Sequence, residues 1–139
     1  MRNITISENK NDLSHNEVNA LVEKVGWGKL YYSTEEKWQR VLNASTHVAY
    51  AKMQDELIAF GRILEDGIMC MFYDICVHPH YQKQGIGTAL MQHLINKIKD
   101  HPYVVIGLFT WEGNQTVHEF YEKFNFEKSY AMQLKMKTV

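Results

Sequence analysis

The stretch Asp74-Ile-Cys-Val-His-Pro-His-Tyr-Gln-Lys-Gln-Gly-Ile-Gly-Thr-Ala-Leu90 decides the fold of this chain, because an apolar strand runs through a glycine turn directly into a helix. Gly85 and Gly87 carry no side chain, so the backbone there can approach a ligand closely. The first amides of a helix have no partner within the helix and point outward. The sequence therefore predicts an anion site, suited to a phosphate, at the start of this helix.

The spacing of the glycines excludes two common phosphate-binding motifs. A P-loop would need a lysine directly before Thr88, and a dinucleotide fingerprint would need a third glycine where Leu90 stands. The pattern that fits is Gln-x-x-Gly-x-Gly, formed by Gln82, Gly85 and Gly87 and preceded by Val77-His-Pro. This pattern resembles the acetyl-coenzyme A loop of the GNAT N-acetyltransferase superfamily.

A second segment, Asn114-Gln-Thr-Val-His-Glu-Phe-Tyr-Glu-Lys-Phe-Asn-Phe126, is similar to a downstream motif of the same superfamily, Asn-x-x-Ala-x-x-Phe-Tyr-x-x-x-Gly-Phe. Val117 takes the place of the alanine and Asn125 that of the glycine. Asparagine tolerates the left-handed conformation that glycine commonly supplies after a helix. An earlier segment, Ala20-Leu-Val-Glu-Lys-Val-Gly-Trp27, resembles bacterial and plastid aralkylamine-acetyltransferase-like members.

The pattern of apolar residues predicts a mixed α/β fold in one domain, residues 1–139. Strands are expected at 3–7, 47–53, 57–65, 68–77, 103–110 and 131–136, with a split of the last strand at 127–129 as an option. Helices are expected after Ser14, after Ser33 or Thr34, from Ile86, and at 116–124. This order is similar to the GNAT fold, which implies a mostly antiparallel, twisted sheet of about six to seven strands flanked by about four helices.

Composition excludes several classes of protein. The 139 residues are 45% hydrophobic and 22% charged, as in a globular domain, and the formal charge of −1 provides no basic field for nucleic acid. No apolar run is long enough for a membrane span, and the opening residues lack a signal-peptide core, so a cytoplasmic protein is expected. Cys70 and Cys76 lie too far apart along one strand for a disulfide, and no spacing of histidines and cysteines predicts a metal site.

The resemblance implies that the co-substrate is acetyl-coenzyme A. The pantetheine arm would be bound by backbone groups of the strand, and the pyrophosphate by the glycine loop. The expected cofactor-binding residues are Ile75, Cys76, Val77, Gln82, Lys83, Gln84, Gly85, Ile86, Gly87, Thr88 and Asn114. The amide of Val77 would face the thioester carbonyl where the strands splay. Two of these residues have simpler alternatives, since Lys83 would also suit a solvated loop and Asn114 would also suit a helix cap.

Acetyl transfer also needs a proton donor for the thiolate and a base for the amine. Tyr121 stands at the family's general-acid position, although an aromatic cluster around Phe120, Phe124 and Phe126 would equally accommodate a core tyrosine. Asp74 is the first candidate for the base. It is a polar residue in an apolar strand, so pairing with a basic side chain inside the sheet is the alternative. His78 and Glu112 are the other candidates for the base.

Aromatic residues are expected to line the acceptor site. Trp27, Tyr31, Tyr32 and Trp111 would suit an amine with an apolar body, whereas Trp38 has the spacing of a core residue. The expected function is an acetyl-coenzyme A-dependent N-acetyltransferase for the primary amine of a small molecule, with peptide or protein N-acetylation and a non-catalytic acyl-coenzyme A sensor as alternatives. The family's habit and the frequency of two-fold symmetry favour a homodimer.

Overall fold

The structure is a computed structural model that describes residues 4–135. Its contacts divide the chain into two compact units, unit 1 (Met1–Leu108) and unit 2 (Phe109–Val139), and each is described by itself. Unit 1 contains η1 (Lys10–Asp12), α1 (His15–Lys24), α2 (Glu35–Ala44), β1 (His47–Met53), β2 (Glu56–Glu65), β3 (Met69–Val77), η2 (Pro79–Tyr81), α3 (Ile86–Ile98) and β4 (Val105–Leu108). Unit 2 contains α4 (Gln115–Glu122).

The sheet of unit 1 has the strand order β1-β2-β3-β4. The pairs β1–β2 and β2–β3 are antiparallel, and β3–β4 is parallel. Gln54 and Asp55 both have positive φ angles, 51° and 68°, as a tight hairpin between β1 and β2 requires. Gly67, with φ of 89°, supplies the left-handed conformation in the turn between β2 and β3.

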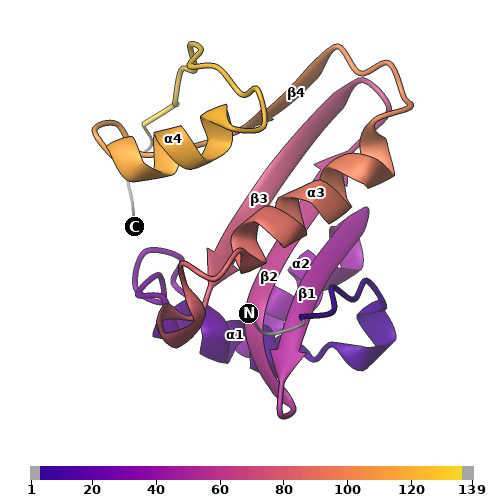
Figure 1. Ribbon diagram of the computed structural model, residues 1–139, viewed down its shortest axis with the longest axis vertical. Coiled ribbons are helices and arrows are strands. Elements are labelled where there is room, and N and C mark those ends of the chain that lie inside the picture. The colour runs from indigo at the N-terminus through magenta and orange to yellow at the C-terminus, as the bar shows by residue number, and fades with distance from the viewer. Residues whose placement is uncertain (1–3, 136–139) are drawn as a thin grey trace. The chain divides into compact units, whose positions relative to one another are not determined.

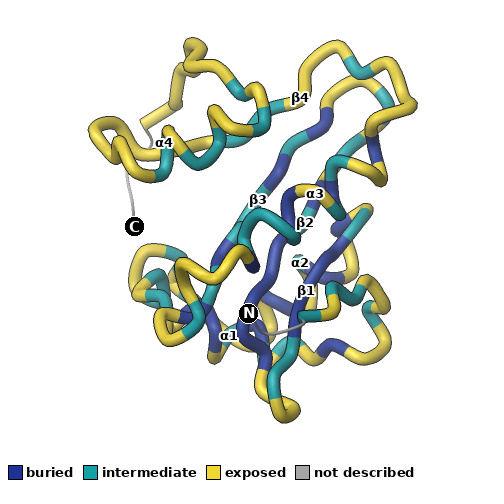
Figure 2. Tube along the Cα trace, viewed as in Figure 1, coloured by how far each residue is buried: buried dark blue, intermediate teal, exposed yellow. Residues whose placement is uncertain are grey.

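The sheet has a core on each face (Figure 1). Behind it in this view, α1 and α2 share a hydrophobic cluster in which Trp38 and Phe60 contact edge to face at 6.3 Å. In front, α3 packs on β1 and β2, and Leu94 lies over Gly61. Burial is greatest along β1 and β2 (Figure 2), which lie between these layers.

Local signals place the helices of unit 1 as the sequence predicted. Ser14 and Glu17 form a complete capping box at the start of α1, and Thr34 caps α2. The helix α3 begins at Ile86, directly after the glycine turn. No helix among residues 4–135 is both long enough and apolar enough to span a membrane.

The expected number of strands is wrong. The described residues form a four-stranded sheet instead of six to seven strands. Near the N-terminus only Ser7 pairs, in a single bridge with Tyr50, and Asn3 lies outside the described residues. Residues 127–135 form no strand, and Met136 again lies outside. A strand exists only where a neighbouring strand pairs with its backbone groups, which alternation of side chains by itself does not provide.

Candidate active site

The start of α3 is built to receive an anion. Its N-cap, Gly85, has φ of 82° and makes no side-chain cap hydrogen bond to the helix. The first helical hydrogen bond runs from Ala89 N to Gly85 O, so the preceding amides, from Ile86 onward, have no helical acceptor. These amides and the positive end of the helix dipole favour a phosphate group. Gln82, Lys83, Gln84 and Gly85 are exposed, as a ligand-binding turn requires.

Space at Gly85 supports this assignment. A Cβ built on Gly85 meets no heavy atom within 4 Å, so the glycine leaves room above the turn for a ligand. Lys83 also has a positive φ, 62°, and the loop therefore makes two left-handed steps before the helix. The residues at this turn fit the pyrophosphate group of acetyl-coenzyme A.

The turn is tied to the end of β3 by side chains. Gln82 Nε2 donates a hydrogen bond of 3.0 Å to the carbonyl oxygen of Val77. The buried His78 accepts a hydrogen bond at Nδ1 from the amide of His80, 3.1 Å away. These contacts hold the segment between β3 and α3 in one shape.

The amide of Val77 points toward the uncovered edge of β3. The amide of His78 donates to Ile58 O in β2 at 2.7 Å, and successive amides of a strand point to opposite edges. β4 pairs with β3 only from Met69 to Phe72, so among the described strands none covers that edge from Tyr73 to Val77. The pairing of β3 with β4 therefore ends at Phe72, earlier than the expected separation after Val77.

Asp74 lies within β3 and is largely buried. Its Oδ1 accepts a 2.7 Å hydrogen bond from the Tyr31 hydroxyl, and its Oδ2 lies 2.5 Å from Arg62 Nε. Burial, followed by the negative charge of Asp74, raises the pKa of the Tyr31 hydroxyl, which therefore stays a neutral donor. The pairing with a basic side chain that the sequence left open is present.

The structure brings two of the four aromatic acceptor candidates together. Trp27 and Tyr31 stack with ring centroids 5.7 Å apart, and Tyr31 stacks in turn on Trp38 at 6.0 Å. Tyr32 is exposed, with the Lys37 ammonium 5.4 Å from its ring. Trp38 is a core residue, as its spacing predicted. The fourth candidate, Trp111, is an exposed residue of unit 2.

Unit 2 holds the second motif. Asn114 caps α4 by accepting a 3.3 Å hydrogen bond from Val117 N, so the capping alternative is present. Tyr121 lies on α4 with its ring 5.1 Å from Phe120 and 5.9 Å from Phe126. Asn125 has φ of 69°, the left-handed conformation expected of the residue in the glycine place.

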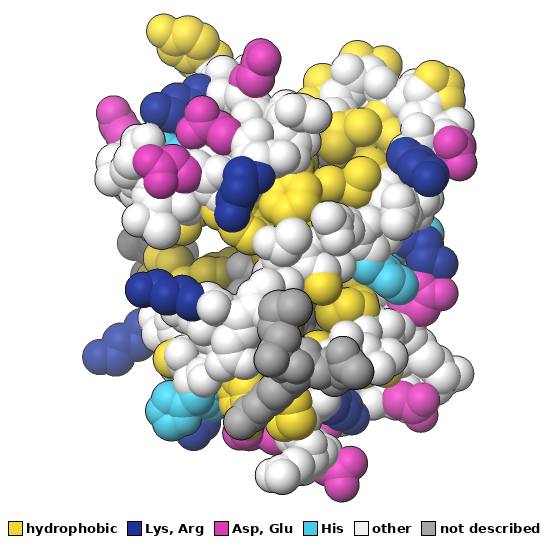
Figure 3. Space-filling view, viewed as in Figure 1, with side chains coloured by type: hydrophobic (Ala, Val, Ile, Leu, Met, Phe, Trp, Pro, Cys, Tyr) yellow, Lys and Arg dark blue, Asp and Glu magenta, His cyan; other side chains and the backbone are white. Residues whose placement is uncertain are grey.

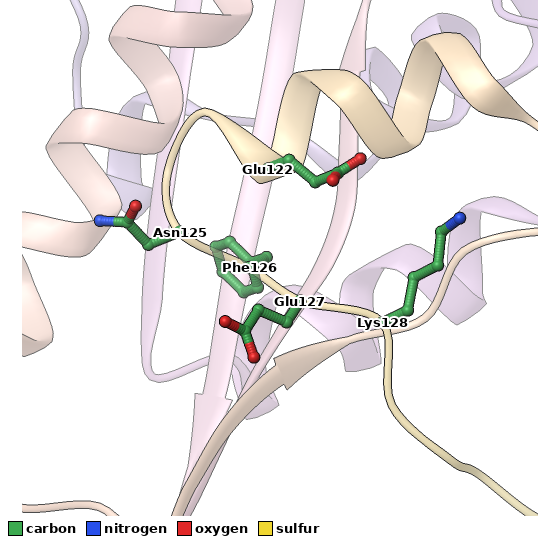
Figure 4. A pocket seen from close by; sticks show the side chains of 5 residues that line it. All are labelled: Glu122, Asn125, Phe126, Glu127 and Lys128. Carbon is green, nitrogen blue, oxygen red and sulfur yellow. The ribbon is translucent and has the colours of Figure 1, made fainter.

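A shallow depression beside the end of α4 is lined by Glu122, Asn125, Phe126, Glu127 and Lys128 (Figure 4). It contains none of the residues that the sequence predicted for the site. Glu112, an alternative base, is exposed in the turn before α4. Unit 2 thus contains Tyr121 on α4 and Asn114 as the N-cap of that helix.

Both cysteines are buried free thiols, and burial raises the pKa of each. Residues 4–135 contain no group of three or more histidine, cysteine, aspartate or glutamate side chains placed to hold a metal ion. Charged side chains of both signs are interspersed over the face shown in Figure 3.

Sequence reasoning missed two residues beside Asp74. Arg62 supplies the cation, and Gly61 faces the point where β3 is irregular. An arginine and a glycine inside an apolar strand were the available signals.

Comparison with known proteins identifies the family of this chain. Residues 13–126 match the model of the acetyltransferase (GNAT) family. The chain is 28% identical over 131 residues to an uncharacterized N-acetyltransferase, ycf52, of Pyropia yezoensis, covering 91% of this chain and 72% of that protein. It is 32% identical over 57 residues to the [ribosomal protein bS18]-alanine N-acetyltransferase of Escherichia coli K12, covering 41% of this chain and 38% of that one.

A solved GNAT-family acetyltransferase from Streptococcus pneumoniae TIGR4 superposes with a TM-score of 0.78 at 26% identity, covering 97% of this chain and all of the other. The family match spans most of the chain and contains both the glycine turn and the α4 motif. This protein belongs to the acetyltransferase (GNAT) family and is an acyltransferase.

Proposed function

We propose that the protein transfers an acetyl group from acetyl-coenzyme A to the primary amine of a small molecule, by direct attack of the amine on the thioester. The observation that carries the proposal is the α3 N-terminus, which has no side-chain cap, lies next to the left-handed Gly85 turn and is tied to the end of β3 through Gln82 and Val77. Family members use acetyl-coenzyme A as co-substrate, and this turn has the shape and charge to bind its phosphates.

Each step of the transfer has a proposed residue. Acetyl-coenzyme A supplies the thioester, whose carbonyl carbon forms a bond to the amine nitrogen while its bond to sulfur breaks. The Val77 amide, on the uncovered edge of β3, donates to the carbonyl oxygen as negative charge develops there. The Tyr121 phenol gives a proton to the departing thiolate. Backbone groups of Ile75 and Cys76 would hold the pantetheine arm.

The proton lost by the amine needs an acceptor. The base role of Asp74 stays a prediction, and His78 and Glu112 remain its alternatives. His78 is buried at the end of β3, with Nε2 4.0 Å from Glu56 Oε2, whereas Glu112 is exposed. Both oxygens of Asp74 already accept hydrogen bonds, one from Tyr31 and one from Arg62.

The acceptor amine is proposed to have an apolar or aromatic body. The ring of Trp27, which stacks on Tyr31, supports this choice, because aromatic faces attract both apolar groups and cations. A peptide N-terminus is the second candidate acceptor, favoured by the similarity to a protein that acetylates a ribosomal-protein alanine. The homodimer and the cytoplasmic location stay predictions.

The test is a coenzyme A release assay with aralkylamines, polyamines, amino acids and short peptides, including peptides that begin with alanine. We expect selective turnover of an aralkylamine. Turnover of peptides alone would select the second candidate, and absence of acetyl-coenzyme A binding by calorimetry would overturn the proposal.

The Tyr121→Phe variant tests the proton donor. We expect its kcat to fall by about 100-fold, since general acid catalysis contributes about 100- to 10,000-fold. Tyr130→Phe is the matched control in the same unit, because Tyr130 is fully exposed and outside the proposed site. Equal kcat for Tyr121→Phe and the wild type would remove Tyr121 from the mechanism.

A further inference from the structure

The Asp74 carboxylate joins three parts of unit 1. Tyr31 belongs to the loop of residues 25–34 between α1 and α2, Arg62 belongs to β2, and Asp74 itself belongs to β3. We propose that Asp74 is a positioning residue, which fixes this loop and its aromatic wall against the sheet through Tyr31, and that it is not the base that deprotonates the amine. The kinetic part of this inference rests on the proposed function.

The backbone of β3 is shaped to aim Asp74 at its two partners. The pairing register shifts between Phe60 and Arg62, so that only Gly61 of β2 faces Asp74 and Ile75 of β3. Such a bulge re-aims a side chain and often lies near a functional site. Asp74 has φ of 58°, an uncommon conformation for a residue other than glycine, which persists only where surrounding contacts determine it.

Gly61 leaves room for side chains that pack at this bulge. A Cβ on Gly61 would lie 2.6 Å from Ile75 Cδ1 and 3.3 Å from Leu94 Cδ1, so the ends of these two side chains would have to shift. The glycine in β2 therefore lets the bulged part of β3 and the helix α3 approach each other. The bulge, the glycine and the buried ion pair form one arrangement around the Asp74 carboxylate.

Tyr31 contacts other residues of the loop, so its position affects theirs. The Tyr31 ring is stacked between Trp27 and Trp38, and the Tyr31 amide donates to Trp27 O at 3.0 Å. Lys37 Nζ donates to the Tyr31 carbonyl at 2.9 Å, and the Trp38 indole donates to Ser33 Oγ at 2.8 Å. A displacement of Tyr31 would therefore also displace Trp27, the ring proposed to contact the acceptor.

The same contacts disfavour Asp74 as the base. Its side chain is 6% exposed, and each carboxylate oxygen already accepts a hydrogen bond. The ionisable groups around it are Tyr31 from the loop, Arg62 from β2 and the Cys76 thiol from β3. Burial beside Tyr31 and Arg62 therefore leaves an amine little access to either oxygen.

The experiment compares Tyr31→Phe, Asp74→Asn and the double variant with Tyr103→Phe. The control is matched, because Tyr103 also donates its hydroxyl to a carboxylate, that of Glu65, away from the proposed site. The first measurement is the rate of tryptic cleavage after Lys29, an exposed residue of the loop. We expect cleavage to accelerate by about tenfold in Tyr31→Phe and Asp74→Asn, as loss of a hydrogen bond to a charged group would allow, and not in Tyr103→Phe.

The second measurement separates positioning from proton transfer. If Asp74 positions the loop, both variants raise the KM of the amine with kcat within about twofold of the wild type, and the rate still rises with pH as the amine loses its proton. The double variant should resemble Asp74→Asn, because that substitution already weakens the contact that Tyr31→Phe removes.

Three results would overturn the inference: loss of the pH-dependent rise in Asp74→Asn alone, an additive double variant, or unchanged cleavage after Lys29 in Tyr31→Phe. If Asp74→Asn does not fold, Tyr31→Phe alone decides through its cleavage rate and amine KM. If the wild type acetylates no amine, the proposed function fails, and the cleavage rate still tests the contact between Asp74 and the loop.

Discussion

Gln82 Nε2 and the Val77 carbonyl oxygen lie 3.0 Å apart and form a hydrogen bond across the segment that leads from β3 into α3. The bond links two proposed binding elements, the phosphate turn and the strand end whose amide faces the thioester. The segment between them contains only η2 and its flanking residues, so this side chain sets the distance from turn to strand.

Replacing Gln82 by alanine should weaken acetyl-coenzyme A binding. One neutral hydrogen bond contributes about 0.5–1.5 kcal/mol, so we expect the Kd to rise by about two- to tenfold in calorimetry. Gln92→Ala, on the exposed surface of α3, is the control. A Kd for Gln82→Ala equal to that of the control would mean that the bond does not shape the site.

Replacing Gly85 by alanine should strain the turn without a steric clash. The φ of 82° disfavours any residue with a Cβ, at a cost of about 1–2 kcal/mol in the free energy of unfolding. Gly67→Ala, with φ of 89° in the β2–β3 turn, should lose similar stability but keep its affinity for acetyl-coenzyme A. Urea unfolding measures the stability of both variants, and calorimetry measures their affinity for acetyl-coenzyme A. Equal affinity in Gly85→Ala and Gly67→Ala would argue against a phosphate site at Gly85.

Two substitutions of Asn114 separate its cap from its proposed contact with the cofactor. Asn114→Ala should lower the free energy of unfolding by about 1 kcal/mol, because the bond to Val117 N is lost. Asn114→Ser should restore this stability, since serine caps equally well. If the carboxamide also contacts acetyl-coenzyme A, both variants bind it more weakly; normal binding by Asn114→Ser would leave only the cap.

Removing Arg62 should be costly for stability. Arg62→Met leaves the Asp74 carboxylate buried without its cation, which should lower the free energy of unfolding by about 3–5 kcal/mol. Lys52→Met breaks the more exposed pair with Glu17 and should cost only about 0–1 kcal/mol. Urea denaturation of the two variants measures the difference, and equal losses would show that burial does not strengthen the Arg62–Asp74 pair.

Alkaline pH should destabilise the fold through its thiols. Burial raises the pKa of Cys70 to about 11 from an ordinary value of about 8.5. The unfolded chain therefore loses this proton first, and stability falls as the pH rises from about 8.5 to about 11. Cys76 adds to the loss, since burial raises its pKa as well.

The urea midpoint measured across this pH range tests the effect. Cys70→Ala should flatten the decline, because one of the two thiols no longer ionises. A midpoint that stays constant up to about pH 11 would contradict the raised thiol pKa.

Much of unit 1 was predictable because its signals are local. The bounds of β1 at His47–Met53 and the start of α3 at Ile86 follow from alternation, helical spacing and the glycine turn. The cap of α1 follows from Ser14 and Glu17, three residues apart. The terminal strand expected at 131–136 could not be predicted from such local signals, because alternating side chains do not specify a partner strand.

The sequence by itself determined the glycine turn before α3, the family motifs and the helices and hairpins whose contacts lie within a few residues. Only the tertiary structure decided that Asp74 meets Tyr31, 43 positions away, and Arg62 on the neighbouring strand. It also decided which edge of β3 the Val77 amide faces. The physical reason is that hydrogen bonds and ion pairs act over a few ångströms in space, and those distances between remote residues are set by strand register, the bulge opposite Gly61 and packing on both faces of the sheet.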